Sequence, residues 1–227
     1  GLDVHAKVPQ REPAGPRGTR ALYRIEPVAA PLPFRTLTPW LRATFGRPVH
    51  RVALDAGASC PNRDGTKGRG GCIYCDVEGS GTGAARSGVE LEQQLCQGIE
   101  RVRRRGAGVG VIAYFQSYSN TYVEPERFAE LLAAVRPHLR EPVVALSIAT
   151  RPDCLPAWAL ALLGQLAREL PVWLELGLEA ASDDVLLAIN RLHTVDEFRN
   201  AVRAAKAQGL LTVGHAILGL PGDGREG

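Results

Sequence analysis

Three of the chain's five cysteines, Cys60, Cys72 and Cys75, lie within the stretch CPNRDGTKGRGGCIYC. Their spacing, C-x11-C-x2-C, leaves a glycine-rich basic loop between the first two thiols. Thiolates bind zinc and iron–sulfur clusters, whereas a disulfide framework needs paired cysteines. Because the cysteine number is odd and the sequence shows no secretory leader or long apolar span, a metal site in a reducing cytoplasm is favoured.

Two kinds of metal site, zinc and iron–sulfur, are compatible with these thiols. A structural zinc site takes four Cys or His ligands, which here would be the three cysteines with a distant histidine, His50 or His5. On a four-iron cubane, three thiolates leave one iron without a protein ligand. That iron could bind S-adenosylmethionine (SAM), and one electron could then cleave its sulfonium bond to release a 5′-deoxyadenosyl radical. A cluster used only as an electron carrier or sensor is the third hypothesis.

Short apolar runs from residue 50 onward predict five strands of a parallel sheet, buried on both faces. They are RVALDA (51–56), VGVIAYF (109–115), VVALSIA (143–149), VWLELGL (172–178) and LLTVGHAIL (210–218). After the first, successive strands begin about 30–40 residues apart, which is typical of βα units in a barrel. Such folds bind ligands beyond the carboxyl ends of their strands, and the cysteine loop directly follows the first strand.

Helical segments separate the predicted strands. A short helix is expected at 38–44, and further helices are expected around Leu95, after Pro125 and after Pro156. Ser182 is predicted to cap a short helix, and TVDE (194–197) to form a capping box. Cys96 shares the apolar face of its helix, which predicts a role in core packing.

The composition is that of an ordinary globular protein, with 45% apolar and 22% charged residues and a net charge of +3. That charge permits contact with nucleic acid without arguing for it. We interpret residues 1–47 as an N-terminal arm with one short helix, and residues 48–227 as a single core domain. The chain has no methionine and ends shortly after its fifth strand, so we expect a fragment of a longer protein, cut at both ends.

From about residue 48 to its end, the chain resembles the radical SAM superfamily, and within it the bacterial YhcC-type proteins. Their pattern DAG-x-x-CPNRDGT-x-GRGGC-x-x-C is matched by DAGASCPNRDGTKGRGGCIYC. Four more segments match in order: YFQSYSNTY, TRPDCLP, ELGLEAASDDVLLAINRLH and HAILGLPG. The resemblance implies an α/β fold, a partial (β/α)6 TIM-like barrel that here stops after its fifth strand. The missing part normally helps to close the barrel, so we expect weak cluster binding or no turnover from the fragment alone.

The resemblance also implies the cofactors and partners. Cys60, Cys72 and Cys75 would hold a [4Fe-4S] cluster, with SAM on the fourth iron and hydrogen abstraction from an unknown substrate as the outcome. A one-electron reductant such as flavodoxin or ferredoxin would be a partner, with no membrane involved. RNA as the substrate follows only from analogy with the catalytic subunit of the elongator complex, which shares the TRPD segment (150–153) but has an acidic residue where this chain has Ala149.

Four residues would meet the amino group and the adenine of SAM by resemblance. Tyr74 stands where the superfamily has an aromatic residue beside the adenine, although it could equally be a hydrophobic cover for the loop. Gln116 and Ser117 replace glycines of a turn that meets the methionine amino group. Gly219, in the turn after the fifth strand, would border the adenine.

The end of the fourth strand resembles the GVQ…R-x-H pattern of coproporphyrinogen-dehydrogenase-like members. Glu179, where relatives more often have Gln, would then accept hydrogen bonds from the ribose hydroxyls, and Arg191 would pair with the methionine carboxylate. A surface salt bridge is the alternative for Arg191. His193 is predicted to close the loop through a hydrogen bond, and Asp153 to cap the next helix or face the site.

Overall fold

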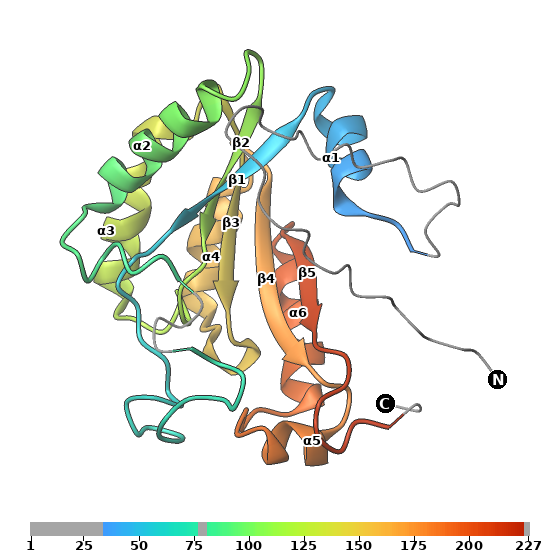
Figure 1. Cartoon of the computed structure of the whole chain (residues 1–227). Helices are drawn as coiled ribbons and strands as arrows, with labels where there is room; N and C mark the ends of the chain where they lie inside the picture. Colours follow the sequence, from blue (N-terminus) through green and yellow to red (C-terminus); the bar gives the residue numbers. More distant parts are fainter. Residues whose placement is uncertain (1–33, 77–80, 225–227) are drawn as a thin grey trace, which may run out of the picture. The chain divides into compact units, whose positions relative to one another are not determined.

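Five parallel strands form one sheet in the order β1-β2-β3-β4-β5 (Figure 1). They are β1 (Val49–Leu54), β2 (Gly110–Phe115), β3 (Val143–Thr150), β4 (Val172–Glu179) and β5 (Leu211–Ala216). The computed structural model describes residues 34–76 and 81–224, so most of the predicted N-terminal arm lies outside the described residues. The prediction of an α/β fold with parallel strands in a partial TIM-like barrel is confirmed, because neighbouring strands follow one another in sequence in an open sheet.

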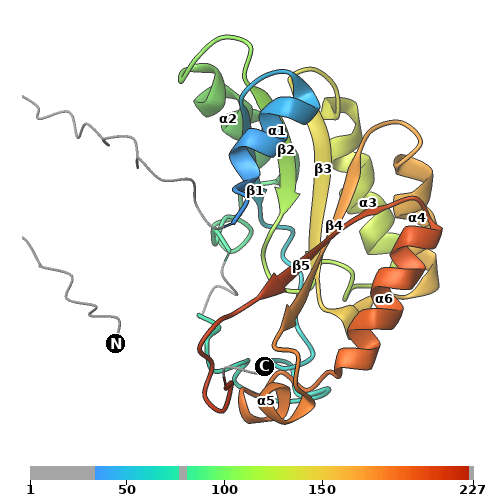
Figure 2. The same ribbon diagram turned by 90° about the vertical axis from the view of Figure 1, so that its right-hand side faces the viewer.

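The helices are α1 (Leu37–Phe45), α2 (Leu91–Arg103), α3 (Pro125–Val135), α4 (Ala157–Leu166), α5 (Asp183–Ala188) and α6 (Val195–Ala207), with short 3-10 turns η1 (Arg136–His138) and η2 (Pro152–Cys154). Helices α2, α3, α4 and α6 cover one face of the sheet (Figures 1 and 2). The predicted caps are confirmed: Ser182 accepts from the backbone N–H of Val185, and Thr194 and Glu197 form the capping box that opens α6.

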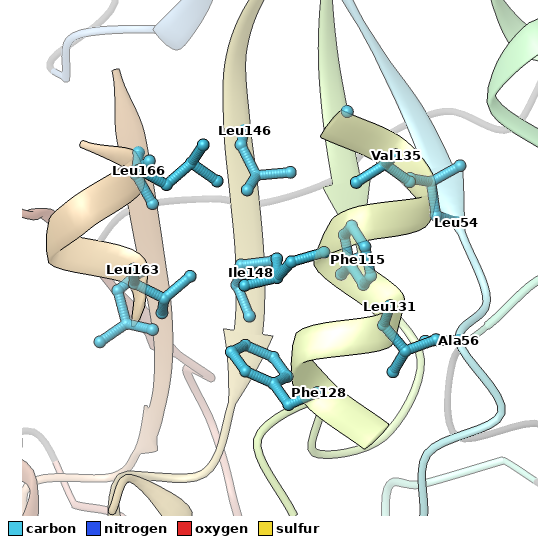
Figure 3. Packing of buried hydrophobic residues seen from close by; sticks show 14 of the residues in the cluster. Leu54, Ala56, Phe115, Phe128, Leu131, Val135, Leu146, Ile148, Leu163 and Leu166 are labelled. Atoms are coloured by element: carbon cyan, nitrogen blue, oxygen red, sulfur yellow. The ribbon is translucent and has the colours of Figure 1, made fainter. Parts of the chain in front are cut away.

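The main hydrophobic core lies between the sheet and helices α2, α3, α4 and α6. Alternate strand residues such as Leu54, Phe115 and Ile148 point toward these helices, and Phe128 of α3 and Leu163 of α4 pack against them (Figure 3). This burial on the outer face turns the intervening residues of every strand toward the opposite, inner face.

An apolar cluster closes the amino-terminal end of the inner face. Ile112, Ala145 and Trp173 come from β2, β3 and β4, and Leu41 of α1 packs on them. The rings of Trp40 and Trp173 lie 5.5 Å apart between centroids, within the usual range for a favourable aromatic pair. Helix α1 therefore belongs to the compact unit that begins at Thr36, while the domain boundary at residue 48 stays a prediction.

A polar row follows the apolar cluster, two residues further along each strand. We call it the polar belt; its members, one from each strand, are Arg51, Tyr114, Ser147, Glu175 and His215. Because side chains two residues apart share one face of a strand, the belt faces the same side as the apolar cluster, one layer nearer to the cysteine loop.

Two details of the core prediction are wrong. Strand β5 is largely exposed rather than buried on both faces, with Leu211 49% exposed, because it has a pairing partner on one side alone. Cys96 is half-buried beside His138 instead of lying within the core, because its neighbours Leu95 and Ile99 occupy the side of α2 that faces the sheet. No helix in the described part of the chain is long and apolar enough to cross a membrane.

Gly98 allows the close packing of α2 on β1 and gives a test of the fold. A Cβ at this position would lie 2.1 Å from Cγ1 of Val52. We expect Gly98→Ala to lower the free energy of unfolding by on the order of 1 kcal/mol, because overpacking of ~1–3 kcal/mol outweighs the better helix propensity of alanine. Urea unfolding measures this loss.

Val52→Ala supplies the control, since it removes the methyl groups that the new Cβ would meet. The double variant should be more stable than the sum of the two single losses predicts. Strict additivity would contradict the close contact.

Candidate functional site

The cysteine loop after β1 is anchored to α2 and folded by its own hydrogen bonds. Gln94 of α2 accepts from the backbone N–H of Asp55 at 2.8 Å and donates to its carbonyl at 2.9 Å. Backbone N–H groups in the loop donate to the carbonyls of Cys60 and Cys72. All three loop cysteines are free thiols, with Cys60 and Cys72 buried and Cys75 half-buried.

The loop is joined to the turn of residues 189–192, which follows α5. The buried Asn62 side-chain amide donates to the carbonyls of Asn190 (2.5 Å) and Arg191 (3.1 Å). In return, the side-chain amide of Asn190 donates to Gly71 O at 2.7 Å, and Ile73 N–H donates to Ile189 O at 3.1 Å. The turn that carries Arg191 is therefore held directly against the loop that carries the cysteines.

One cavity of about 390 Å³ brings the predicted residues together at the carboxyl ends of the strands. Its lining includes all three cysteines of the loop and four of the six residues that resemblance assigned to SAM: Tyr74, Gln116, Glu179 and Arg191. Ser117 and Gly219 are not among the lining residues. Ser117 is fully buried beneath the surface, so its side chain is not presented to the cavity.

Glu179 and Arg191 form a buried ion pair at the carboxyl end of β4. Arg191 Nη2 lies 3.4 Å from Glu179 Oε1 and donates to Gly177 O at 3.1 Å, while Nη1 lies 3.9 Å from Cys72 Sγ. Both residues are 8% exposed, so the surface-salt-bridge interpretation of Arg191 is wrong. Arg191 Nε is buried with no hydrogen-bond partner among the described residues. The guanidinium therefore keeps one donor for a ligand.

The sulfur atoms of the loop receive hydrogen bonds from polar neighbours. Arg63 Nη2 donates to Cys75 Sγ at 3.1 Å, and Asn62 Nδ2 lies 3.6 Å from Cys72 Sγ. Donors of this kind stabilise thiolates and tune iron–sulfur clusters. Three free thiols with such donors around one cavity fit the cluster that the sequence predicts.

In the part of the chain that the structure describes, the zinc alternative lacks its fourth ligand. His50 is exposed near the amino-terminal end of β1, whereas the cysteine loop follows the other end, four residues or about 13 Å away. His5 lies outside the described residues. Within 34–76 and 81–224, no three His, Cys, Asp or Glu side chains converge on a point where they could hold a single metal ion.

Asp153 joins the cysteine loop to β3 rather than capping a helix. Its carboxylate accepts two hydrogen bonds from Arg151, both at 2.9 Å, and one from Lys67 of the loop at 2.6 Å. Burial would raise the pKa of Asp153, but Arg151 and Lys67 lower it overall. Arg151, 1% exposed, also donates to Arg191 O at 2.8 Å. The TRPD segment thus supports both the loop and the turn.

His193 does not close its loop through a hydrogen bond, and that prediction is wrong. Both ring nitrogens are buried without a partner among the residues that the structure describes. Burial, together with the charge of Arg191, lowers the pKa of His193 to about 3. The neutral imidazole therefore acts as a packing group between charged neighbours.

Sequence reasoning did not indicate the contacts of several residues that hold the site or face it. Asn62 and Lys67 lie inside the quoted loop motif, and Arg151 inside the TRPD segment, but no motif indicates which carbonyl or carboxylate they contact. Glu175 and His215 gave a clearer signal, because an ionisable residue in the middle of an apolar strand needs a partner.

Comparisons with known proteins agree with the geometry of the site. The model of the radical SAM superfamily matches residues 63–227. "Uncharacterized protein YtqA" of Bacillus subtilis is 38% identical over 85% of this chain, and "Protein YhcC" of Escherichia coli is 37% identical over 82% of it. This chain spans 59% and 58% of the lengths of those two proteins.

A solved structure shares the fold. Elp3 of Methanocaldococcus infernus, with residues 1–46 deleted, superposes with a TM-score of 0.56 at 19% identity. The match covers 79% of this chain and 40% of that chain. At this identity the likeness supports the architecture and no shared substrate.

Asn62 tests the connection between the loop and the turn. Asn62→Ala removes two hydrogen bonds to buried carbonyls, so we expect a loss of ~1–3 kcal/mol in unfolding free energy. Hydrogen exchange at the amides of Lys67 and Gly71 should accelerate. The exposed Asn200→Ala on α6 is the matched control and should change stability by less than ~0.5 kcal/mol. Equal effects from the two variants would contradict the connection.

His193 predicts a pH dependence of stability. Its pKa is about 3 in the folded protein against 6.5 as the ordinary value, so the folded state binds fewer protons below pH 6.5. The contribution of His193 to the free energy of unfolding is fully present above pH 6.5. It declines as the pH falls toward 3, by up to about 1.4 kcal/mol per pH unit. Urea unfolding of His193→Gln should show a flatter decline over this range than the parent. The same decline in His193→Gln and in the parent protein would contradict the prediction.

Proposed function

The chain belongs to the radical SAM superfamily, whose members generally cleave SAM with the help of an iron–sulfur cluster, and we propose that this chain carries the cluster-binding and SAM-binding part of such an enzyme. The observation that carries the proposal is the convergence of Cys60, Cys72 and Cys75 with Arg191 on one cavity at the carboxyl ends of the strands. Because the chain spans 58–59% of the length of its curated relatives, the activity of the whole protein is part of the proposal.

The three thiols would hold a [4Fe-4S] cluster as thiolates. Asn62 and Arg63 stabilise the negative charge on sulfur, because their N–H groups already point at Cys72 and Cys75. When bound, the cluster would supply the electron and SAM the 5′-deoxyadenosyl radical. Burial of Cys60 and Cys72 keeps water away from the metal-binding sulfurs.

Four cavity residues would orient SAM. Arg191 has a free Nε donor for the methionine carboxylate, and its backbone is fixed by Asn62. Glu179 would accept from the ribose hydroxyls once a ligand carboxylate competes for Arg191. The backbone of Glu179 has a positive φ of 67°, which is a strained conformation of the kind found at functional sites. Tyr74 would lie beside the adenine, and Gln116 would meet the amino group through its backbone or side chain.

A one-electron reductant such as flavodoxin or ferredoxin completes the proposal, since radical SAM enzymes generally need one. RNA is the substrate class that the elongator resemblance suggests, and it rests on that resemblance alone. The further steps of the reaction depend on residues that meet the substrate.

Anaerobic reconstitution of the chain tests the proposal. We expect about four iron and four sulfide per chain and an EPR signal of the reduced cluster that changes when SAM is added. Cys72→Ala should lose the signal, whereas the control Cys96→Ala should keep it, because Cys96 lies on α2 outside the cavity. Release of 5′-deoxyadenosine after reduction is the second readout.

Other outcomes would contradict the proposal in distinguishable ways. Zinc in place of iron would favour a non-catalytic module. A four-iron signal that SAM does not alter would favour an electron carrier or sensor. Repeating the titration with a longer form of the protein, of the length of its relatives, would show whether residues beyond this chain restore the response.

A further inference from the structure

The polar belt places an ionised carboxylate at the centre of the inner face of the sheet. The Glu175 side chain is 0% exposed and receives hydrogen bonds from Ser147 on β3 and from Arg51 on β1, the latter at 3.2 Å. Burial would raise the pKa of Glu175, but hydrogen bonds from His215 and Ser147 and the charge of Arg51 lower it overall. Glu175 is therefore a fixed anion, and its neighbours are arranged around that charge.

His215 on β5 lines the same cavity as Glu175. Its Nε2 lies 2.7 Å from Glu175 Oε2, and its side chain is 45% exposed. Because Glu175 is ionised, Nε2 carries the proton of this hydrogen bond and Nδ1 is the nitrogen left for another partner. A carboxylate behind an imidazole in this way orients the ring and makes the outer nitrogen more basic.

The charges that face His215 support a basic imidazole. The hydrogen bond to Glu175 raises the pKa of His215, burial lowers it, and the charges of Glu175 and Glu179 raise it further against Arg51. Tyr114 on β2 lines the same cavity, and burial and then the charge of Glu175 raise its pKa, so it remains a neutral phenol.

The belt lies deeper than the groups that resemblance assigns to SAM. Glu175 and Glu179 stand four residues apart on the same strand, which corresponds to about 13 Å along it. Gly177 lies between them, and all three line the cavity. Thus one cavity has a rim with cysteines, Glu179 and Arg191, and a floor with Tyr114, Glu175 and His215.

We propose that the floor of the cavity is a second ligand site, where His215, oriented by Glu175, accepts a proton from a weakly acidic N–H or O–H group of the substrate. That this ligand is the substrate rests on the proposed function above. The proton moves from the substrate heteroatom to Nδ1 of His215, and its bonding electron pair stays on the substrate. The Nε2–H group of His215 remains hydrogen-bonded to the Glu175 carboxylate. The imidazolium that forms is stabilised by the carboxylate, so no oxidant or further reactant is needed.

A purely structural network would not need a third hydrogen-bond partner for Glu175. Arg51 and Ser147 already donate to Glu175, yet His215 approaches from the edge strand as a third partner and also lines the cavity. Ser147, by contrast, is fully buried and serves the carboxylate alone. Of these two hydrogen-bond partners, His215 lines the cavity and Ser147 does not, so His215 is the one that can meet a ligand there.

The test uses the whole chain, labelled with ¹⁵N in its histidines, first without cluster or SAM. Succinimide, a cyclic imide with one acidic N–H, is the probe, and N-methylsuccinimide, which lacks that proton, is the matched control ligand. We expect succinimide to shift the Nδ1 resonance of His215, which His215→Gln identifies by its disappearance. N-methylsuccinimide should leave this resonance in place. Glu175→Gln should weaken succinimide binding about tenfold or more, as loss of an ionic partner predicts.

Ser147→Ala guards against a folding failure in Glu175→Gln. It removes one hydrogen bond from the carboxylate while Arg51 and His215 remain, so the fold should persist and succinimide binding should weaken less than in Glu175→Gln. The buried His193 resonance reports whether each variant is folded. Equal shifts with both imides, or no shift of His215 at the solubility limit of succinimide, would overturn the proposal.

A second measurement separates the floor from the SAM site. In reconstituted protein saturated with SAM, His215 should still respond to succinimide. Loss of the response would assign His215 to SAM binding and overturn the second site. If the cluster fails to assemble while succinimide still shifts the His215 resonance in the metal-free chain, the result counts against the proposed function alone.

Discussion

The contact between the cysteine loop and the turn of residues 189–192 is the constraint on which the site depends. Neither segment belongs to a helix or strand, so neither has a backbone ladder to fix it. Asn62 and Asn190 replace that ladder by donating to each other's backbone segments. Because loops without such bonds are the least stable parts of a protein, this contact decides whether the cysteines and Arg191 share one cavity at all.

Charge is distributed along the inner face of the sheet in layers. From the amino to the carboxyl ends of the strands, an apolar layer under α1 comes first, and the polar belt with its single buried carboxylate follows. The rim of the cavity comes last, where arginine side chains lie close to the cysteine sulfur atoms. Buried charges are costly unless paired and hydrogen-bonded, and each here has its partner on a different strand or loop: Glu175 with Arg51, Glu179 with Arg191, Asp153 with Lys67. These pairs tie together segments that the helices on the outer face do not connect.

The sequence indicated the sheet, the caps of α5 and α6 and the position of the cysteine loop, because each depends on local pattern. Apolar runs identify strands, and Ser182 and Thr194 act within one helical turn. The sequence could not indicate that the Asn62 side chain donates to the carbonyl of Asn190, or that the ring nitrogens of His193 lack hydrogen-bond partners among the described residues. Both depend on how closely two loops that are distant in sequence approach each other. The exposure of β5 could not be predicted either, because an apolar run does not show whether a strand pairs with one neighbouring strand or with two.

Gly177 carries a consequence for the shape of the cavity. A Cβ there would lie 2.2 Å from Glu179 Oε1 and 2.4 Å from Arg191 Nη2, so any side chain would force the pair at the rim apart. One missing methyl group thus lets the carboxylate of Glu179 and the guanidinium of Arg191 meet over the backbone of β4, and the rim of the cavity depends on that absence.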